Sequence, residues 1–463
     1  MIPTPKGFSS GPVLAATNAA TVSNTQSLGV FSPKKVDGTQ RWFFGTTTKL
    51  YESSSSGGTL TDRSGATYNA VDPTQTWSFC QFGDVTLASN KGDVLQQINA
   101  GSAFADVSGA PKASIIINAG PPTAPFILAL NFYTAACGDM KDGIFNSGLA
   151  DYTGWTTGTN QAATFQIFEP SGAIVAAIPY RDGAVCWKNG SMFELNYSAA
   201  ATIPGWSAKR IATDVGCAGK NMCVSVNDVI YFADKHGIWM YDGSYPKKVP
   251  GYFHDFWATK VAAGLVTDTC QMRFDPSRHN LWLSYSNAGA SNDTMNWLVW
   301  NQISNLWADL GPLGLVTNSK LVREIFTFEP SPLATTKQAS SGWSVETFAY
   351  DQSSNDNTTI YTPPTMTLWN IGDPIGYTTV ERIAPVWYGS NTPSALSTCV
   401  LAAKNSQNAA TIQSVTGTID SNSLYLDARL SANWVQPTLK IYGAYEFGSV
   451  GLSVTPSGQR GTR

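Results

Sequence analysis

The chain has 463 residues, of which 13% are charged and 12% aromatic, and its formal net charge is −3. The charged share is about half the ~25% of ordinary soluble domains, which excludes a coiled coil, a long solvated helix and a charged disordered tail. A nearly neutral chain also lacks the basic balance of proteins that bind nucleic acid mainly through charge. The length suggests about three domains, or fewer if some are large β domains.

The first 40 residues are expected to form an extended N-terminal arm. After them, short apolar runs closed by Gly, Asn, Asp or Ser predict β-strands rather than helices, beginning near Trp42. Residues 83–96 predict a hairpin that turns at residues 90–92, and residues 115–117 predict a further strand.

The later hairpins repeat this plan. Residues 182–195 turn at Asn189-Gly190, which predicts a type I′ turn because both central positions favour positive φ. Residues 227–241 predict the next hairpin, and the strand predicted at 281–285 is expected to pair with one at 296–300. The units begin at intervals of about 48 residues, which is typical of propeller blades.

The fold class predicted from this spacing is all-β. We expect a β-propeller of about five to seven degenerate blades over residues 41–310. A loop-rich connection with a few strands, such as residues 324–328, should follow over residues 311–362. Residues 363–463 predict an additional C-terminal β region, either a second β domain or a last blade with an added sheet.

The seven cysteines are odd in number and scattered, and none forms a C-x-x-C pair. This pattern favours reduced thiols in a protein folded in a cytosol and predicts neither a disulfide framework nor a metal site. The N-terminus lacks the order of a signal peptide, and the most apolar run, residues 125–130, is far shorter than a membrane span. We therefore expect no stable membrane insertion.

The three histidines offer little for catalysis. His236 falls in a predicted turn, and His279 stands beside Arg278 where a strand begins. His254 is followed by Asp255, a pairing that suggests a general base, but neighbours on a predicted strand point to opposite faces. No G-x-S-x-G nucleophile motif is present.

Other motifs depart from the patterns that their chemistry needs. Residues 216–221 have the wrong glycine spacing for a phosphate loop, which predicts a strand-linking turn. A calcium loop needs more closely spaced acids than Asp228, Asp234 and Asp242. In residues 233–239 the spacing of Asp, Gly and Trp differs from that of the sialidase motif. We therefore predict no catalytic, cofactor-binding or metal-binding residues, and a protein that is not an enzyme.

A series of short motifs runs through the chain in a recognisable order. They are residues 77–90, 109–113, 215–216, 225–232 and 237–243, then Asp275-Pro276 ahead of a Trp-rich strand pair, and finally residues 423–429 and 458–463. From about Arg41 to Arg463 this series resembles the tail nozzle (tail tubular) proteins of short-tailed bacteriophages. Residues 1–40 show no match to that family.

The resemblance implies a structural virion protein with a β-propeller fold and no cofactor. Six copies would form a ring or tube below the portal and its adaptor ring, assembled in the host bacterial cytoplasm and carried in the virion tail. DNA would be ejected through the lumen without tight binding, and a tail needle, fibres or tailspikes would attach further out. The alternative from another class is a glycan-binding propeller, a lectin or virion adhesin, and a degraded glycosidase comes third.

The resemblance also bears on the basic residue pairs. A conduit for DNA should not hold it, and each phosphate contact by Lys or Arg adds affinity through counterion release. We therefore expect Lys34-Lys35, Lys209-Arg210 and Lys247-Lys248 to lie on outer or inter-ring surfaces rather than around the lumen.

Overall fold

Most of the chain is described by the computed structural model, in segments separated by gaps. The described residues are 2–9, 13–14, 22, 26–53, 58–72, 75–101, 103–199, 205–251, 253–286, 295–315, 320–329, 332–338, 342–349, 365–367, 371–372, 376–388, 397–407, 409–419, 425–441 and 446–459. Parts of the motifs at 423–429 and 458–463 lie outside the described residues.

Seven antiparallel sheets, here called blades 1 to 7, follow one another along the chain. Blade 1 comprises β4 (Val30–Phe31), β5 (Trp42–Gly45), β6 (Leu50–Ser53) and β7 (Leu60–Asp62). Blade 2 comprises β8 (Ser78–Phe82), β9 (Val85–Ser89), β10 (Gln96–Ile98) and β11 (Ala105–Asp106). Blade 3 comprises β12 (Lys112–Ala119), β13 (Phe126–Thr134), β14 (Gly138–Asn146) and β15 (Ala163–Gln166).

The remaining blades follow the same order. Blade 4 comprises β16 (Ile174–Tyr180), β17 (Gly183–Lys188), β18 (Ser191–Tyr197) and β19 (Trp206–Thr213). Blade 5 comprises β20 (Cys223–Val226), β21 (Val229–Asp234), β22 (Gly237–Tyr241) and β23 (Lys247–Lys248), and helix α1 (His254–Ala262) follows it. Blade 6 comprises β24 (Met272–Asp275), β25 (Asn280–Ser286), β26 (Met295–Asn301) and β27 (Trp307–Pro312). Blade 7 comprises β28 (Gly314–Leu315), β29 (Lys320–Thr327), β30 (Leu333–Gln338), β31 (Gly342–Ala349) and, from the N-terminus, β3 (Val13–Leu14).

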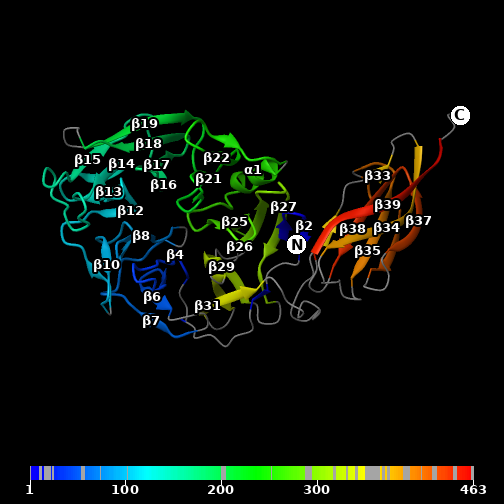
Figure 1. The fold of residues 1–463 in the computed structure, drawn as a ribbon, viewed down its shortest axis with the longest axis horizontal. Coiled ribbons are helices and arrows are strands. Elements are labelled where there is room, and N and C mark those ends of the chain that lie inside the picture. The colour runs from blue at the N-terminus through cyan, green and yellow to red at the C-terminus, as the bar shows by residue number, and fades with distance from the viewer. Residues whose placement is uncertain are drawn as a thin grey trace.

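The seven blades close into a ring. Strand β4 lies beside β8, β8 beside β12, and so on through β16, β20 and β24 to β29, which returns to β4. The protein is therefore a β-propeller whose inner strands surround one axis, with the blades arranged around it in Figure 1. Seven blades confirm the upper end of the predicted range.

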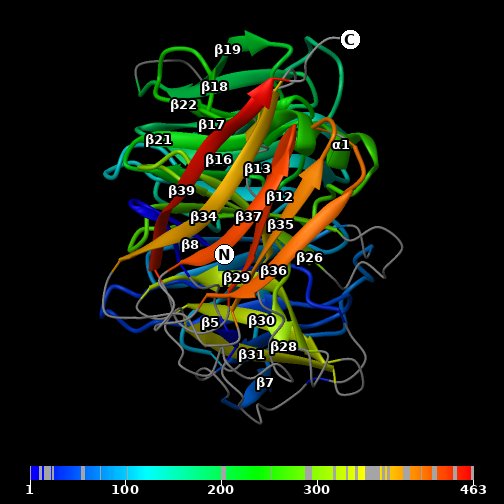
Figure 2. The ribbon, with the colours of Figure 1, turned by 90° about the vertical axis from the view of Figure 1, so that its right-hand side faces the viewer.

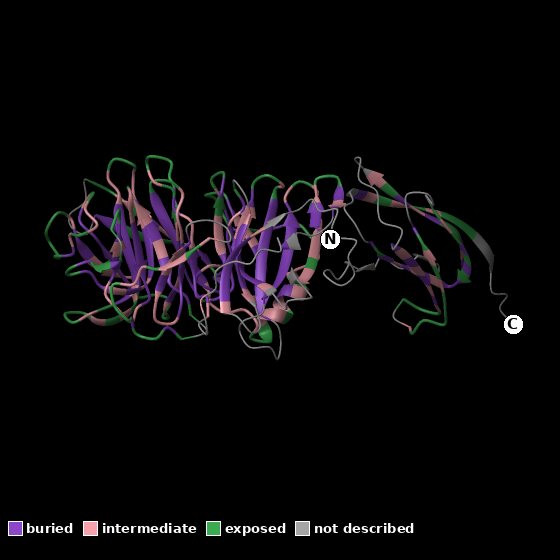
Figure 3. Ribbon diagram, turned by 90° about the horizontal axis from the view of Figure 1, so that it is seen from below, coloured by how far each residue is buried: buried purple, intermediate pink, exposed green. Residues whose placement is uncertain are grey.

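Apolar side chains fill the spaces between neighbouring blades. One cluster joins blades 1 and 2, others join blades 2 and 3 and blades 3 and 4, the largest extends over blades 4 to 7, and a small one joins blades 7 and 1. Trp187 of blade 4, for example, packs against Phe232 of blade 5, with ring centroids 5.1 Å apart. Figure 3 shows these buried residues, in purple, along the strands of the blades.

The last blade lies where the sequence predicts a loop-rich connection. Strands β28 to β31 occupy residues 314–349, so the propeller extends past the expected boundary at 310, while the expected boundary at 362 lies outside the described residues. Hydroxyl-bearing residues make this segment look like a loop, yet several are buried inside the sheet. Thr336 and Ser344, for example, bond to each other through their hydroxyls at 2.9 Å, and the Ser344 hydroxyl also donates to Glu346.

The hairpin at residues 182–195 is confirmed, but the type I′ turn predicted for it is wrong. Asn189 and Gly190 form a two-residue loop, and neither has positive φ. The chain after β19 packs on this loop: the N–H of Asp214 donates to the Gly190 carbonyl at 2.8 Å. A Cβ on Gly216 would lie 2.1 Å from the Asn189 carbonyl oxygen. These tertiary contacts outweigh the local preference of the two residues.

The C-terminal region forms a separate β-sandwich, the first of the two arrangements left open by the sequence. One sheet has the order β1 (Ile2–Thr4), β2 (Gly7–Ser9), β39 (Glu446–Gln459), β34 (Gly376–Tyr388) and β37 (Leu426–Ala432). The other has the order β32 (Thr365–Thr367), β38 (Trp434–Lys440), β35 (Thr398–Lys404) and β36 (Gln413–Thr418), and β33 (Ile371–Gly372) also pairs with β38. Figure 2 shows these long strands in front of the propeller. The core of the sandwich includes Val380 and Leu439.

The N-terminus is not an extended arm, because it adds strands to both bodies. Strand β2 pairs with β39, and Phe8 stacks on Phe447 with ring centroids 6.3 Å apart. Strand β1 lies against β26 and β27, and Ile2 is fully buried in the propeller core. Further along, β3 joins the outer edge of β31. The first residues of the chain thus hold the sandwich to the propeller and complete blade 7.

Candidate functional site

Three loops meet at the axis of the propeller, each just before the chain enters the inner strand of a blade. Thr76 precedes blade 2, Lys220 and Asn221 precede blade 5, and Asp268 precedes blade 6. Lys220 Nζ donates to the Thr76 carbonyl at 2.5 Å, and Asn221 Nδ2 donates to Thr76 Oγ1 at 3.0 Å. Because blades 2 and 5 are not neighbours in the ring, these bonds cross the propeller axis at one end.

The Lys220 ammonium is held in an environment that opposes its charge. Its side chain is buried, and burial lowers its pKa to about 8, while Asp268 partly opposes this change. The backbone N–H of Lys220 also donates to Asp268 Oδ1 at 3.2 Å, which anchors the loop to blade 6. Lys220 thus forms a hydrogen bond across the propeller axis, and the free energy of unfolding depends on whether its amine is protonated.

A second buried polar cluster closes the ring between blades 7 and 1. The Glu324 carboxylate accepts the Ser27 hydroxyl and, at 2.8 Å, the backbone N–H of Gly29. Arg323 Nε donates to the Ser27 carbonyl at 2.8 Å. Burial raises the pKa of Glu324, while Arg323 and these hydrogen bonds partly oppose the rise. Charged side chains of β29 therefore hold the segment that leads into β4, in addition to the small apolar cluster between blades 7 and 1.

The same network continues to blade 6. Arg273 Nε donates to the Ile325 carbonyl at 3.1 Å, and Gln271 Oε1 accepts the Ile325 N–H at 3.2 Å. Burial lowers the pKa of Arg273 and of Arg323, and the Glu324 carboxylate partly offsets the effect on both. Most of these bonds run from a side chain to the backbone of another blade, so the arrangement fixes blades to one another.

None of the three histidines is arranged with a nucleophile in the described part of the chain. His236 lies in the turn between β21 and β22, and His279 lies with φ of 56° in the turn between β24 and β25. His254 begins helix α1, so the strand predicted for His254 and Asp255 is wrong. Its Nδ1 accepts the Ile238 N–H at 3.3 Å and its Nε2 lies 2.9 Å from the Val249 carbonyl, which is a packing role.

Helix α1 forms because the aromatic residues around His254 have somewhere to pack. Trp257 is fully buried, and its Nε1 donates to the Asp234 carbonyl at 2.7 Å. Phe253 stacks on Trp307 of blade 6, with ring centroids 5.0 Å apart. The helix therefore covers the junction of blades 5 and 6.

The glycine-containing segment at 216–221 links β19 to β20, as the sequence predicts. Burial raises the pKa of the Cys217 thiol, and the neighbouring Cys223 adds to this rise. Across the described residues, no group of three or more His, Cys, Asp or Glu side chains is arranged to hold a metal ion. The described residues also include no helix of the length and apolarity needed to span a membrane.

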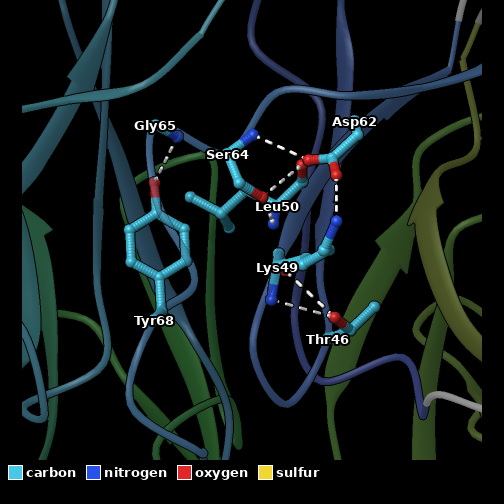
Figure 4. Close-up of polar contacts among 7 residues, drawn as sticks. All are labelled: Thr46, Lys49, Leu50, Asp62, Ser64, Gly65 and Tyr68. Carbon is cyan, nitrogen blue, oxygen red and sulfur yellow. Dashed lines mark hydrogen bonds and ion pairs between the residues drawn. The ribbon is translucent and has the colours of Figure 1, made fainter.

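Polar contacts also fix the outer strands of blade 1 (Figure 4). Lys49 forms an ion pair with Asp62 of β7, and its backbone N–H donates to Thr46 Oγ1 at 3.1 Å. Nearby, the half-buried Glu52 accepts Arg41 Nε at 2.6 Å and Arg63 Nε at 2.7 Å. Burial alone would raise the pKa of Glu52, but the two guanidinium groups outweigh it and the pKa is lowered.

Two of the basic pairs lie on the outermost strands of their blades. Lys209-Arg210 is exposed on β19, and Lys247-Lys248 is exposed on β23. Lys248 Nζ donates to the His236 carbonyl at 2.9 Å. Lys34 is exposed and Lys35 half-buried in the loop between β4 and β5. Their position relative to a lumen between subunits stays a prediction.

No protein-family model and no curated protein matches the sequence. Among solved structures, a virginiamycin B lyase from Staphylococcus aureus is 9% identical and covers 71% of this chain and 97% of its own, with a TM-score of 0.40. YCF48 from Cyanidioschyzon merolae is 12% identical over 73% and 98%, with a TM-score of 0.41. BBS1N, crystallised with ARL6DN, is 10% identical over 73% and 97%, with a TM-score of 0.42. These neighbours are β-propellers, one of them an enzyme.

Proposed function

We propose that this chain is a tail nozzle subunit of a short-tailed bacteriophage, a structural virion protein that acts without catalysis. Six copies would form a ring or tube below the portal and adaptor, through which DNA is ejected. The observation that carries the proposal is the ordered series of motifs. Residues 77–90 form β8 and β9, residues 225–232 reach from β20 into β21, and residues 237–243 contain β22, so the series follows consecutive propeller strands.

The crossed axis determines where DNA would travel in such an assembly. Lys220 and Asn221 bond to Thr76 across the mouth of the propeller. A duplex therefore cannot pass through a single propeller without breaking these bonds. In a nozzle the lumen would lie between subunits, on the symmetry axis of the ring.

Charge supports a lumen that does not retain DNA. Each chain carries a formal net charge of −3, so a hexamer carries −18. The exposed pairs Lys209-Arg210 and Lys247-Lys248 lie on outer strands, where they could pair with acidic surfaces of neighbouring tail proteins. A neutral or acidic lumen would release fewer counterions on contact with phosphates and would let DNA slide.

The sandwich supplies surface for attachment. Ile412, Tyr425 and Val454 are large apolar side chains on it that are 60%, 43% and 40% exposed. In the proposed nozzle this body would contact the adaptor ring, a neighbouring subunit, or a needle, fibre or tailspike.

Native mass spectrometry of the purified protein, combined with negative-stain imaging, tests the proposal. Six chains of 49.6 kDa give a ring or tube of 298 kDa. A monomer at every concentration, stabilised by sugar, would favour the lectin alternative and overturn the nozzle. Submicromolar binding of duplex DNA at physiological salt would contradict the proposed lumen.

A further inference from the structure

An open cavity of about 530 Å³ lies between blades 2 and 3, which are neighbours in Figure 1. One wall is the turn of residues 107–110 that follows β11, and the other is formed by Lys112 and by residues 133–135 at the end of β13. Its volume falls in the ~300–1,000 Å³ range of small-molecule sites. We call it the blade 2–3 groove.

An aromatic side chain offers an exposed ring on this groove. Tyr133 is 43% exposed, and its hydroxyl has no hydrogen-bond partner within the described residues. Tyr133 stands directly opposite Lys112 on β12 and opposite Asp139 on β14, so the three side chains share one face of blade 3. Asp139 is paired with Lys91 at 2.8 Å, which leaves that carboxylate neutralised.

The polar groups around the ring retain bonding capacity. Asp106 Oδ1 accepts Gln96 Nε2 at 2.6 Å, and its second oxygen is available. Lys112 Nζ donates to the Gly92 carbonyl at 3.0 Å, which leaves further N–H donors. Ser108 adds a hydroxyl on the opposite wall. One carboxylate and one ammonium line the groove, so its formal charge is balanced.

We propose that the blade 2–3 groove binds a neutral saccharide. The face of a pyranose ring carries C–H groups that pack on an exposed aromatic ring, while its hydroxyls both donate and accept hydrogen bonds. Tyr133 supplies the ring, Asp106 an acceptor, Lys112 a donor and Ser108 a group that does both. The balanced charge disfavours an anionic sugar or a phosphate. This inference does not rest on the proposed nozzle function, since it needs one chain only.

Saturation-transfer difference NMR on the full chain tests the proposal, with maltotriose, cellotriose and chitotriose as neutral probes and sialyllactose as an anionic one. At least one neutral probe should bind at a concentration of about 10 mM or below. Tyr133→Ala should weaken that binding at least about tenfold, and Tyr133→Phe should retain most of it. Tyr245→Ala is the matched control, because Tyr245 is 54% exposed in blade 5, away from the groove.

Each other outcome counts against the groove. Failure of all three neutral probes to bind overturns the proposal, as does binding of sialyllactose alone. Equal loss in the Tyr133→Ala and Tyr245→Ala variants would place the contact elsewhere. Intrinsic tryptophan fluorescence and thermal melting of each variant show that it is folded, so lost binding cannot be ascribed to unfolding.

Discussion

Replacing Lys220 by Met should remove a specific pH dependence from the stability of the propeller. The Lys220 pKa is about 8 in the folded chain, against an ordinary value of 10.5. This difference corresponds to a cost of roughly 3 kcal/mol for keeping the ammonium charged in the fold. At pH 7 the Lys220→Met variant no longer has this cost. It also loses the hydrogen bond to the Thr76 carbonyl, which contributes about 1.5–3 kcal/mol for a charged donor, so the two effects largely cancel.

The sign of the pH effect follows from which state holds the proton more tightly. The unfolded chain keeps the Lys220 proton up to about pH 10.5, whereas the folded chain releases it near pH 8. The free energy of unfolding therefore rises with pH between these values in the wild type. Relative to Lys220→Met, the wild type should gain roughly 2.5 kcal/mol between pH 7 and pH 10.

Urea unfolding followed by tryptophan fluorescence, at four pH values from 7 to 10, measures this gain. Because tyrosines and cysteines also titrate in that range, the quantity to compare is the difference between wild type and variant at each pH. Lys209→Met, at an exposed position on β19, controls for the loss of one positive charge and one long side chain. A difference that stays constant within about 0.5 kcal/mol from pH 7 to 10 would refute the reasoning.

Three other substitutions address the packing and the polar contacts. Trp187→Ala should cost about 3–5 kcal/mol in urea unfolding, because its fully buried ring packs between blades 4 and 5; a cost below about 1 kcal/mol would contradict this packing. Gly45→Ala should cost about 1–3 kcal/mol, since the new Cβ would lie 2.0 Å from the Trp77 ring, and an unchanged melting temperature would show that the ring moves freely. Glu52→Gln should cost about 1 kcal/mol at low salt and less at 1 M salt. Since the folded pKa of Glu52 is below 4.5, its contribution should be lost as pH falls through that folded value, and a pH-independent cost would argue against the ion pairs.

Local pattern was sufficient to predict most of the propeller. The strands at 281–285 and 296–300 are unbroken apolar runs, and they form the buried centre of blade 6. Only one strand of blade 7, at residues 324–328, was predicted. The others were missed because buried positions include Thr335, Thr336 and Ser344, whose hydroxyls find partners only inside the folded sheet. Composition cannot distinguish such a strand from a loop.

Contacts between distant residues were beyond sequence reasoning. Nothing around Lys220 indicates that its side chain reaches Thr76, 144 residues away. The turn at Asn189-Gly190 and the helix at His254 differ from their local predictions because other segments pack on them. The blade 2–3 groove likewise depends on two blades that meet only after folding, although its residues lie within 50 positions of one another.

The pairing of β2 with β39 sets an order of events during protein synthesis. Phe8 leaves the ribosome about 440 residues before its partner Phe447, an interval of roughly 20–90 s at ~5–20 residues per second. Through this interval strand β2 has no strand of the sandwich to pair with, and its unpaired edge is open to mispairing or to chaperone binding. Ribosome profiling combined with pulse proteolysis would show protease resistance of residues 7–9 arising only at termination.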